Sequence, residues 1–555
     1  MAVQKMILRG PRGWTTLTPS GDSRLIYVAN AGNNANDGLT ANTPKQTVAA
    51  GKALLRNGYP DWLQLKCGDT FDEALGSFEG ISGRSITQRM VITSYGTGAR
   101  PILRTGTSNC IETSNHNNQP NYIALRDLAM TAHTYDGSGT GPYGVFTLQT
   151  CNGWLIEGCE IYNYRFGIVM QDDGVSTTGA QIRRNVIHDI YNTVGGSNAC
   201  SGMYLQGLIS PLIEENIIDK ASWASDANWS IYFHSMYVHN DVVTPIVRNN
   251  LFANGDGIQV RPGGNCTGNV GSRVRVGIEY GLGTFPAVQG ITGNCDDNCI
   301  LQSHSPGIAN GDSQAHYTGM RAGNMAGGTI RRNIFANAMD TADPAEATVL
   351  SFESANTDST DRAMQNVTIS DIIACDFGGD GIETHISRAG TFSGNAITRL
   401  VIQNPNKTVC NGYYAPGANF NAYLIAFFQG TPTSAEFTWD HCHLSRNATL
   451  VANHDAGQHH EVLYNGINIF SFTTFYTQVS ATNSDSTVQT YPHNTLATLG
   501  EYYKYLGYSD QGSDAANHAA FMTLAKGQRK TNWDPRFTAQ NIRTYVVNYC
   551  FGSPW

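Results

Sequence analysis

The chain has 555 residues, of which 59 are glycine and only 14% are charged. A single apolar core stops growing at about 250 to 300 residues, so a chain of this length either splits into domains or repeats one unit. The formal net charge of −9 includes no basic run, which argues against nucleic acid as the main partner. No segment reads as a membrane span, and residues 1–20 lack the apolar run of a signal peptide. We therefore expect no membrane insertion and no export by the general secretory route.

The opening segment carries three short motifs in succession. An Asn-rich and Gly-rich stretch runs from Asn30 to Gly38, Gly38-Leu39 follows, and Pro44-Lys-Gln-Thr47 comes next. This order resembles the start of right-handed parallel β-helix proteins of the pectate-lyase-like superfamily from bacteria and phages. The resemblance implies a strand from Ile26, a short helix over residues 48–55 and a further strand from Trp62. The helix would cap the open end of the stack, where strand groups otherwise lack partners.

A phrase of the form Ile-x-x-Asn-x-(Ile/Phe) recurs along the middle of the chain. Its copies lie about 25 to 40 residues apart, the range in which one supersecondary unit stacks on the next. Apolar and polar residues alternate within each copy, which favours short strands over helices. Each copy is too short to bury its own apolar face, so the copies must share one core. The pattern predicts an all-β fold, a right-handed parallel β-helix. The clear copies contain Asn185, Asn216, Asn250 and Asn333, and degenerate ones begin at Ile156 and Ile369.

The asparagine of each copy falls where the pattern requires a bend. Asparagine tolerates unusual backbone angles, and its amide can bond the main chain of the next turn. We therefore predict that the four asparagines stack side by side.

The phrase fades after Asn447, and helical spacing begins near Leu496. A second helical stretch follows near residues 515–525, and Asn532-Trp-Asp-Pro-Arg-Phe537 resembles the closing segment of the same superfamily. We expect an N-terminal arm (1–24), an N-terminal cap with the first turns (25–120), a β-helix body (121–446) and a C-terminal cap or oligomerisation region with helices (447–555).

Most of the 12 cysteines are expected to be small apolar residues of the core rather than disulfide partners. The one close pair, Cys295 and Cys299, lacks the second pair or the histidine spacing of a zinc site. No aspartate cluster recurs across the aligned turns, so neither structural metal nor Ca²⁺ is expected.

Aligning the strand that opens each turn on its leading small residue produces a register. The second and fourth positions are mostly apolar and point inward, so the third and fifth point outward. The aligned segments are 167–171, 202–206, 230–234, 257–261, 349–353 and 381–385. Their outward positions are rich in Tyr, His, Gln, Arg and Glu. Turns about 5 Å apart match an extended polymer such as a sugar chain better than a compact ligand.

Two reactions fit this strip. In β-elimination from a uronic acid, His234 or Tyr232 would take the proton, while Arg261 with Gln259 would neutralise the carboxylate. In hydrolysis, the best pair of carboxylates is Glu353 and Glu383, on neighbouring turns. Asp172, Asp173 and Asp256 are reserves, although each sits in an Asp-Gly turn. The sequence leaves lyase and hydrolase open. Further residues expected to bind the sugar are Tyr204, Gln206, Gln259, His385, Trp223 and Trp229.

A long β-helix with a groove of polysaccharide size resembles a bacteriophage tailspike. That resemblance implies a homotrimer on the virion, or an extracellular protein, that binds and degrades a bacterial surface polysaccharide without a cofactor. The alternatives are a bacterial polysaccharide lyase or glycoside hydrolase, and a fibre protein that binds glycan without cleaving it.

Overall fold

A computed structural model describes most of the chain, in two compact units. The described residues are 13–113, 118–194, 199–221, 232–281, 290–302, 318–337, 348–353, 364–375, 382–385, 392–403, 425–428, 437–440, 443–444, 462–464, 467–469 and 496–555. The N-terminal unit comprises residues 1–224, 241–246 and 526–534, and the C-terminal unit comprises residues 225–240, 247–525 and 535–555. The boundary near residue 225 falls inside the stretch expected as one β-helix body.

The N-terminal unit begins with the strand and the short helix that the opening motifs imply. Strand β1 (Leu25–Val28) pairs in parallel with β2 (Trp62–Lys66). Helix α1 (Val48–Lys52) begins after Thr47, whose side chain accepts a hydrogen bond from the Ala50 amide. Gly51 brings the helix against the strands, because a Cβ atom there would lie 2.3 Å from Val28 and 2.9 Å from Leu63. A side chain larger than hydrogen would therefore push α1 off the first strands.

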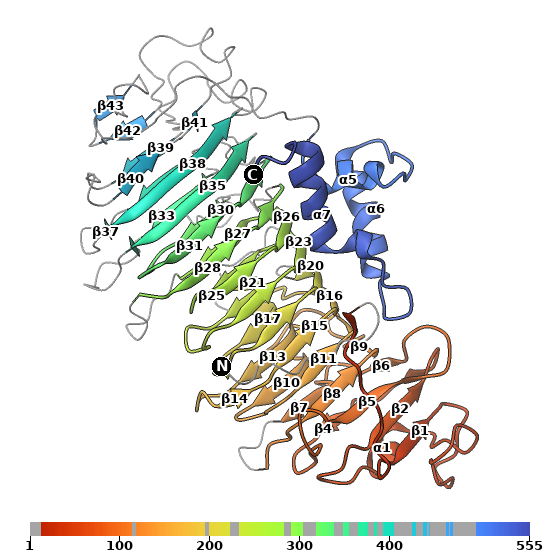
Figure 1. Ribbon diagram of the computed structural model, residues 1–555. Coiled ribbons are helices and arrows are strands. Elements are labelled where there is room, and N and C mark those ends of the chain that lie inside the picture. Colours follow the sequence, from red (N-terminus) through yellow and green to blue (C-terminus); the bar gives the residue numbers. More distant parts are fainter. Residues whose placement is uncertain are drawn as a thin grey trace. The chain divides into compact units, whose positions relative to one another are not determined.

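The remaining strands of the N-terminal unit form parallel stacks, each strand pairing with its equivalent one turn later (Figure 1). One stack continues from β2 with β5 (Met90–Tyr95), β8 (Ile123–Arg126), β11 (Leu155–Glu157), β15 (Gln181–Arg183) and β19 (Leu212–Glu214). The next consists of β3 (Thr70–Phe71), β6 (Ile102–Arg104), β9 (Ala129–Thr131), β12 (Glu160–Tyr162), β16 (Val186–Ile190) and β20 (Ile217–Ala221). The strands β4 (Gly76–Ser77), β7 (Ile111–Thr113), β10 (Tyr143–Leu148), β13 (Phe166–Gln171) and β17 (Cys200–Leu205) form the separate sheet that carries the predicted polar strip. A small pair, β14 (Thr177–Thr178) and β18 (Leu208–Ile209), lies at its margin.

The C-terminal unit repeats this arrangement. One stack consists of β22 (Ile246–Arg248), β25 (Gly264–Thr267), β28 (Gly293–Asp296), β31 (Gly328–Arg331), β35 (Val367–Cys375), β38 (Asn395–Gln403) and β40 (Phe437–Asp440). The next consists of β23 (Leu251–Gly255), β26 (Val270–Val274), β29 (Cys299–Ile300), β32 (Ile334–Ala336) and β41 (His443–Leu444), and the long β35 and β38 contribute to both. The separate sheet consists of β21 (Phe233–Val238), β24 (Ile258–Val260), β27 (Val276–Tyr280), β30 (Thr318–Ala322), β33 (Thr348–Glu353), β36 (Ile382–His385), β39 (Ile425–Phe428), β42 (Val462–Tyr464) and β43 (Ile467–Ile469). A marginal pair is β34 (Met364–Gln365) with β37 (Phe392–Ser393). The predicted all-β parallel β-helix is confirmed.

The bend in each repeated phrase lies one residue before the asparagine. Arg184, Glu215, Asp297 and Arg332 have φ angles of 53°, 58°, 64° and 52°, in the left-handed region. Residues other than glycine adopt that region only where the surrounding structure holds them there. The asparagine that follows supplies this restraint, so its part is hydrogen bonding rather than an unusual backbone angle of its own.

The predicted stacking of asparagines is present within each unit. In the N-terminal unit, the side-chain oxygen of Asn216 accepts hydrogen bonds from the main-chain amide and the side-chain amide of Asn185, both at 3.0 Å. The Asn185 side chain in turn donates to the Ile156 carbonyl at 2.9 Å. Cys159 occupies the position before Asn185, and its amide donates to the Asn185 side chain. The Asn185 side chain therefore bonds the turns on both sides of it.

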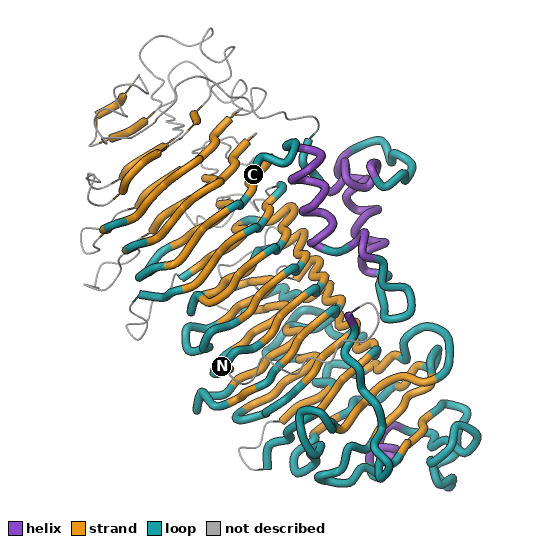
Figure 2. The backbone as a smooth tube through the Cα atoms, in the orientation of Figure 1, coloured by secondary structure: helices purple, strands orange, loops and turns teal. Residues whose placement is uncertain are grey.

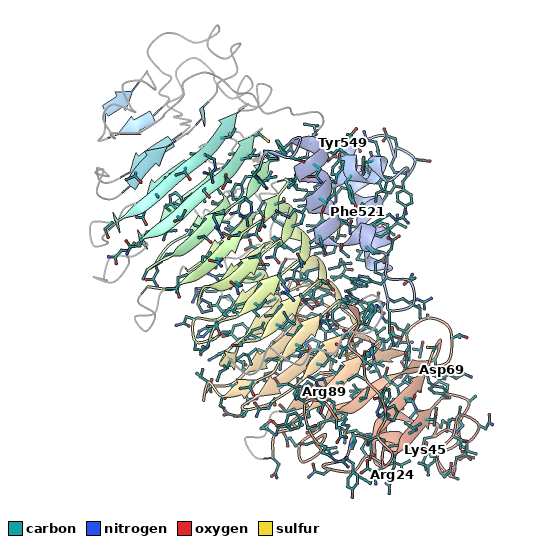
Figure 3. All side chains as sticks on the ribbon, in the orientation of Figure 1. Arg24, Lys45, Asp69, Arg89, Phe521 and Tyr549 are labelled. Carbon is teal, nitrogen blue, oxygen red and sulfur yellow. The ribbon has the colours of Figure 1, made fainter. Side chains whose placement is uncertain are left out.

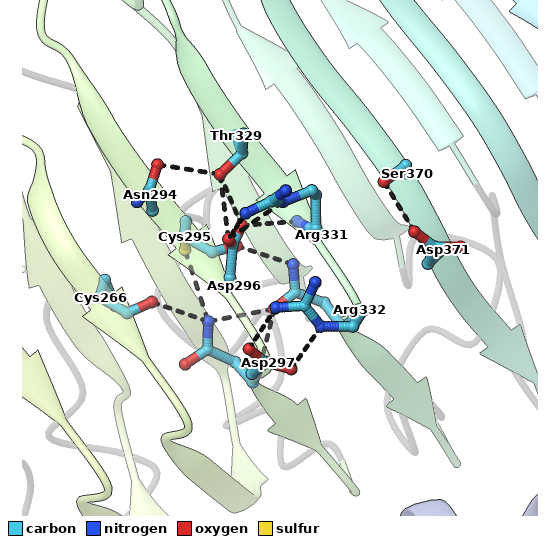
Figure 4. Close-up of polar contacts among 12 residues, drawn as sticks. Cys266, Asn294, Cys295, Asp296, Asp297, Thr329, Arg331, Arg332, Ser370 and Asp371 are labelled. Carbon is cyan, nitrogen blue, oxygen red and sulfur yellow. Dashed lines mark hydrogen bonds and ion pairs between the residues drawn. The ribbon is translucent and has the colours of Figure 1, made fainter. Parts of the chain in front are cut away.

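In the C-terminal unit the ladder runs through four asparagines rather than the two expected. Asn250, Asn269, Asn298 and Asn333 are all completely buried. Each side-chain oxygen from Asn269 onward accepts from the main-chain and side-chain amides of the asparagine before it, at 2.8 to 3.1 Å. Figure 4 shows part of this region, where Asp297 also binds Arg332 and Asp296 binds Thr329 and Arg331. The two asparagines missed in the sequence follow Cys266 and Cys295, which stand where the other phrases have Ile or Val.

Removing a central ladder amide should destabilise the C-terminal unit. Asn298→Ala takes away the side-chain partner of the Asn269 main-chain and side-chain amides and of the Cys266 carbonyl. A buried polar group left unsatisfied costs about 1 to 3 kcal/mol, so we expect a loss of about 2 to 4 kcal/mol in the free energy of unfolding. Asn265→Ala is the matched control, because Asn265 is exposed on β25 of the same unit and should change stability by less than about 0.5 kcal/mol. Equal chemical-denaturation midpoints for the two variants would contradict the ladder's role.

Helices are concentrated in the C-terminal part of the chain (Figure 2). Helices α5 (Leu499–Tyr505), α6 (Asp514–Lys526) and α7 (Ala539–Tyr545) are followed by a π-helix at Val546–Cys550. Phe521, labelled in Figure 3, is fully buried and lies 5.7 Å from the ring of Tyr502 and 5.3 Å from that of Phe537. Within the C-terminal unit these helices lie along the flank of the strands, since α7 contacts β26 and Gln302 donates to Asp514. None of the described helices is long and apolar enough to cross a membrane.

Residues 526–534 belong to the N-terminal unit and bind it together with the chain's beginning. Lys526 forms a 2.7 Å ion pair with Asp219, and Arg100 donates to the Gln528 carbonyl. The ring of Trp533 meets that of Trp14 edge to face at 5.6 Å. Segments from both ends of the chain are thus fixed to the same unit.

Buried His518 and partly buried His188, one in each unit, should make opposite contributions to acid stability. Burial, with Arg273 nearby, lowers the pKa of His518 to about 3. Burial alone would lower the pKa of His188, but its contacts with Asp189 and Glu160 raise that pKa above its ordinary value. As the pH falls below about 6.5, His518 binds a proton in the unfolded chain but stays neutral in the folded protein. The free energy of unfolding therefore falls by about 1.4 kcal/mol per pH unit. His188 instead contributes stability that is present below about pH 6.5 and is lost as the pH rises through its folded-state pKa.

We therefore expect His518→Asn to reduce the stability lost between about pH 7 and about pH 5 by about 2 kcal/mol. His188→Gln should increase that loss. Urea unfolding of the two variants and of the parent protein at both pH values checks the signs. The same acid sensitivity in all three proteins would contradict the assignment.

Candidate functional site

The predicted outward strip is present in both separate sheets, but one of its segments was placed in the wrong register. Val169 pairs with Tyr204, and Ser351 pairs with Glu383, as the alignment expects. Segment 230–234 is displaced by five residues, because Tyr237 rather than Tyr232 pairs with Gln259. Tyr232 precedes β21 and is 49% exposed. The predicted place of Tyr232 in the strip is therefore wrong, and Tyr237 occupies that position.

Two turns of the strip were missed altogether. Gln259 pairs with Glu279 on β27, and Glu279 pairs with Arg321 on β30, which in turn pairs with Ser351. Both missed strands begin with glycine in the same pattern, at Gly277-Ile-Glu-Tyr and Gly319-Met-Arg-Ala. The signal was thus available in the sequence, but the repeated asparagine phrase was not recognised for these turns.

Four neighbouring strands of the C-terminal unit bring together a group of polar side chains, here called the polar cluster. Tyr237, Gln259, Glu279 and Arg321 alternate with apolar side chains such as Met236, Ile258 and Ile278, which are buried in the core, so these four occupy the face of the sheet turned away from the core. His234 and Asp256 stand two residues before Met236 and Ile258, and they join the group through the contacts of His234 with Tyr237 and with Asp256. Its members are His234, Tyr237, Asp256, Gln259, Arg261, Arg275, Glu279 and Arg321.

Asp256 anchors one end of the cluster. Its carboxylate accepts hydrogen bonds from the amides of Gly257 and Val276 at 2.9 and 3.2 Å, and from the Arg275 guanidinium at 2.7 Å. The His234 Nδ1 atom lies 3.8 Å from the same carboxylate. The Asp256 carboxylate thus both bonds the amide of the following glycine and lies near the predicted base, His234.

His234 is held as a neutral imidazole. It is 8% exposed rather than outward and open, because Asp256, Tyr237 and neighbouring arginines surround it. Burial lowers the pKa of His234, Asp256 and Glu279 oppose the shift, and Arg275 and Arg261 add to it. At neutral pH the ring therefore carries no proton on one nitrogen, which is the form that accepts one. The expectation of an exposed His234 is wrong, and its role as a base stays a prediction.

Tyr237 links the histidine to Arg261. Its ring lies 5.2 Å from the His234 ring, and the Arg261 guanidinium carbon lies 4.9 Å from the centre of the Tyr237 ring. A guanidinium over an aromatic face is attracted by the ring's electron density and keeps its donors directed sideways. His234, Tyr237 and Arg261 consequently form one continuous group.

Gln259 and Glu279 form the centre of the cluster. The Gln259 side-chain amide donates to the Glu279 carboxylate, and Arg321 lies 3.2 Å from the other oxygen of that carboxylate. Gln259 is only 6% exposed. Because the Gln259 side-chain nitrogen binds Glu279, the side-chain oxygen of Gln259 is directed away from Glu279.

Gln259 and Arg261 each have a buried atom with no hydrogen-bond partner among the described residues. These atoms are the Oε1 atom of Gln259, an acceptor, and the Nε atom of Arg261, a donor. Buried polar atoms are nearly always satisfied, so such orphans often mark the place of a ligand. A ligand that offers both a hydroxyl and a negatively charged or carbonyl oxygen would satisfy both atoms.

The other residues expected in the site are distributed differently. Tyr204 and Gln206 belong to the N-terminal unit, on and just after β17. Strands β33 and β36 pair so that Glu353 lies opposite His385, which keeps Glu353 and Glu383 on neighbouring turns. The side chains of Glu353, Glu383 and His385 lie outside the described part of the structure, as do Trp223 and Trp229 entirely.

Metal and disulfide chemistry have few candidates in the described residues. No group of three or more His, Cys, Asp or Glu side chains there is arranged to hold a metal ion. The ten described cysteines are free, and all but Cys67 are buried. Cys266 and Cys295 lie opposite each other on β25 and β28. Cys295 is thus a core position of the asparagine phrase rather than half of a metal motif with Cys299.

Comparison with known proteins gives similarity of structure only. No protein-family model matches the chain, and no curated protein sequence does. Similar solved structures include a PL6 alginate lyase in complex with a trisaccharide, at 14% identity and a TM-score of 0.44, with 81% of this chain and 92% of the other covered. A rhamnogalacturonan lyase is 11% identical with a TM-score of 0.39, covering 67% and 87%. The GH136 lacto-N-biosidase from Eubacterium ramulus is 11% identical with a TM-score of 0.34, and the match covers 68% of this chain and 64% of the length of that protein. The chemistry must therefore be argued from this chain's own residues.

Proposed function

We propose that the protein cleaves an acidic polysaccharide at the polar cluster, by β-elimination from a uronic acid unit. The observation that carries the proposal is a buried histidine that contacts a carboxylate and a tyrosine, with an arginine over the ring of that tyrosine. The orphan atoms of Gln259 and Arg261 support it, since a sugar hydroxyl and a carboxylate would satisfy them.

The cluster offers a group for each part of such a reaction. His234 would take the proton from the carbon beside the uronate carboxylate, and Arg261 would hold that carboxylate as negative charge develops on it. The Gln259 Oε1 atom would accept a hydrogen bond from a sugar hydroxyl, because its nitrogen is engaged by Glu279. The electron pair of the broken C–H bond forms the new C=C bond, and the C–O bond to the leaving sugar breaks. Tyr237, next to His234, would supply the proton that the leaving oxygen takes. Asp256 is a positioning residue, since it orients both His234 and Arg275.

Hydrolysis is the second candidate, favoured by the neighbouring positions of Glu353 and Glu383 on β33 and β36. It requires one carboxylic acid that donates a proton and one carboxylate. The described carboxylates of the cluster are less suited to that division, because Asp256 is bound by Arg275 and Glu279 by Arg321.

A panel of bacterial capsular and lipopolysaccharide glycans, polyuronates and neutral glycans tests the proposal. We expect new reducing ends only with polymers that contain uronic acid. Cleavage of neutral polymers alone would contradict the acidic substrate, and full binding without any new ends would favour the non-catalytic fibre protein.

A tailspike-like homotrimer acting on a bacterial surface polysaccharide stays a further proposal, as does a place on the virion. A bacterial polysaccharide-degrading enzyme is the alternative. Light scattering at micromolar concentration tests the trimer, and a stable monomer would reject it.

A further inference from the structure

A second group of polar side chains, suited to bind sugar hydroxyls, lies in the N-terminal unit. Its strands contribute no residue to the polar cluster. Strands β13 and β17 are parallel neighbours. Gln206 continues their pairing, because its main-chain amide donates a hydrogen bond to the Met170 carbonyl at 2.9 Å. This places the Gln206 side chain beside that of Gln171. We call the side chains of Gln171, Asp173, Tyr204 and Gln206 the amide strip.

The four side chains of the amide strip hold one another in place. The Gln206 Oε1 atom accepts hydrogen bonds from the Gln171 amide and the Tyr204 hydroxyl, each at 3.1 Å. The Gln206 amide donates to the Asp173 carboxylate at 3.2 Å. All four remain partly or fully accessible to solvent. The strip is therefore ordered before any ligand arrives, which lowers the entropy cost of binding.

A buried neighbour directs Asp173 outward. Asp172 is 1% exposed and accepts hydrogen bonds from Gly174, Ser176 and Thr177 at 2.8 to 3.1 Å. These bonds fix the loop after β13, so the adjacent Asp173 is exposed. Among the described residues, the Asp173 carboxylate accepts a hydrogen bond only from the Gln206 side-chain amide. No described residue donates to the side-chain oxygen of Gln171. Acceptors for additional hydroxyl groups are thus available at both ends of the strip.

An aromatic surface lies beside the strip on β10 and β13. The ring of Tyr143 stacks on those of Phe146 and Phe166, at 4.8 and 5.2 Å between ring centres. Phe146 pairs with Val169, which pairs with Tyr204, so half-buried Phe146 lies two strands from Tyr204 in the same outward row. A flat apolar surface next to ordered acceptors suits the two faces of a sugar ring, one apolar and one bearing hydroxyls.

The charge of this region selects against acidic sugars. Residues 143–148, 166–178 and 199–210 contain no lysine or arginine but include Asp172 and Asp173. Arg165, just before β13, is 8% exposed, and its guanidinium carbon lies 5.2 Å from the centre of the Phe166 ring. Its donors bind the carbonyls of Ala199 and Gly139, so it is already engaged rather than offered to a carboxylate at the strip. A uronate carboxylate would meet Asp173 without a compensating cation, whereas a neutral hydroxyl would donate to it. We infer that the amide strip binds neutral sugar units of a glycan, as a site separate from the one proposed for cleavage.

Binding and cleavage can be measured separately. Affinity electrophoresis with a neutral glucan, a neutral galactomannan and a polyuronate, and calorimetry with neutral hexasaccharides, would use the full chain with or without His234→Ala. We expect binding to at least one neutral glycan, and the double variant Gln171→Ala/Gln206→Ala should weaken it by about tenfold or more. Gln181→Ala is the matched control, since it removes a partly buried glutamine from β15 in the same unit.

A conservative variant guards against misfolding. Tyr204→Phe keeps the ring and removes only the hydroxyl bonded to Gln206. It should weaken binding of the same neutral glycan by severalfold, with an unchanged thermal unfolding midpoint. Unchanged affinity in both variants, no binding to any neutral glycan, or a loss of polyuronate affinity in the double variant as large as the loss of neutral-glycan affinity would overturn the inference. Since binding is scored in the His234→Ala background as well, absence of cleavage leaves the result for the strip intact.

Discussion

Replacing His234 by alanine is expected to lower the turnover of a uronic acid polymer by about 10³-fold. A positioned base contributes about 10² to 10⁴ to the rate, and no other described imidazole of the cluster contacts Asp256. Because the pKa of His234 lies below its ordinary value, the acid limb of the pH–rate profile should fall below about pH 6.5. Initial rates of chain cleavage across a pH series measure both effects.

His133→Ala provides a matched control, because His133 is exposed in the N-terminal unit, far in sequence from the cluster. Arg261→Ala should weaken binding as well as rate, since a group that holds the carboxylate contacts the ground state too. If His234→Ala and Arg261→Ala keep full activity while Glu353→Gln or Glu383→Gln loses it, the carboxylate pair is the site.

Replacing Arg183 by alanine should have the largest effect on stability, a loss of about 3 to 5 kcal/mol in the free energy of unfolding. Arg183 is fully buried in the N-terminal unit and forms ion pairs with Glu157 and Glu214 at 3.1 and 2.7 Å. It also donates to the Thr15 hydroxyl and the Gly13 carbonyl. Its removal would leave two buried carboxylates without that cation and release the segment at Gly13.

Arg104→Ala is the control for this prediction. Arg104 pairs with Asp72 at 3.2 Å in the same unit, but both side chains are largely exposed, so the change should cost less than about 1 kcal/mol. Denaturant unfolding of the two variants compares them directly. An equal loss in both would show that the buried network contributes no more than a surface pair.

The sequence predicted the architecture because the stacking rule is local. Alternation of apolar residues and one asparagine per turn are enough to indicate parallel strands and a hydrogen-bonded ladder. Asn269 and Asn298 were missed because cysteine replaces the leading aliphatic residue, and because Asn250 and Asn269 are only 19 residues apart. A shorter turn than expected was not counted as a turn.

The candidate site was predicted less completely, for a geometrical reason. Register in a short strand depends on which small residue begins it, and segment 230–235 offers Ser230 and Ser235 as equally plausible starts. The choice of Ser230 put Tyr232 in place of Tyr237 and placed His234 outward in the open. Pairing across strands, which no single segment encodes, brings His234 to Asp256 and Arg275 and buries it.

The central claim is that the polar cluster cleaves a uronic acid polymer by β-elimination. The most direct test is the ratio of unsaturated uronate, followed by its absorbance, to new reducing ends in the same reaction. β-Elimination predicts one unsaturated end for each new reducing end, with both signals lost together in His234→Ala. New reducing ends without unsaturated uronate, retained in His234→Ala, would contradict it.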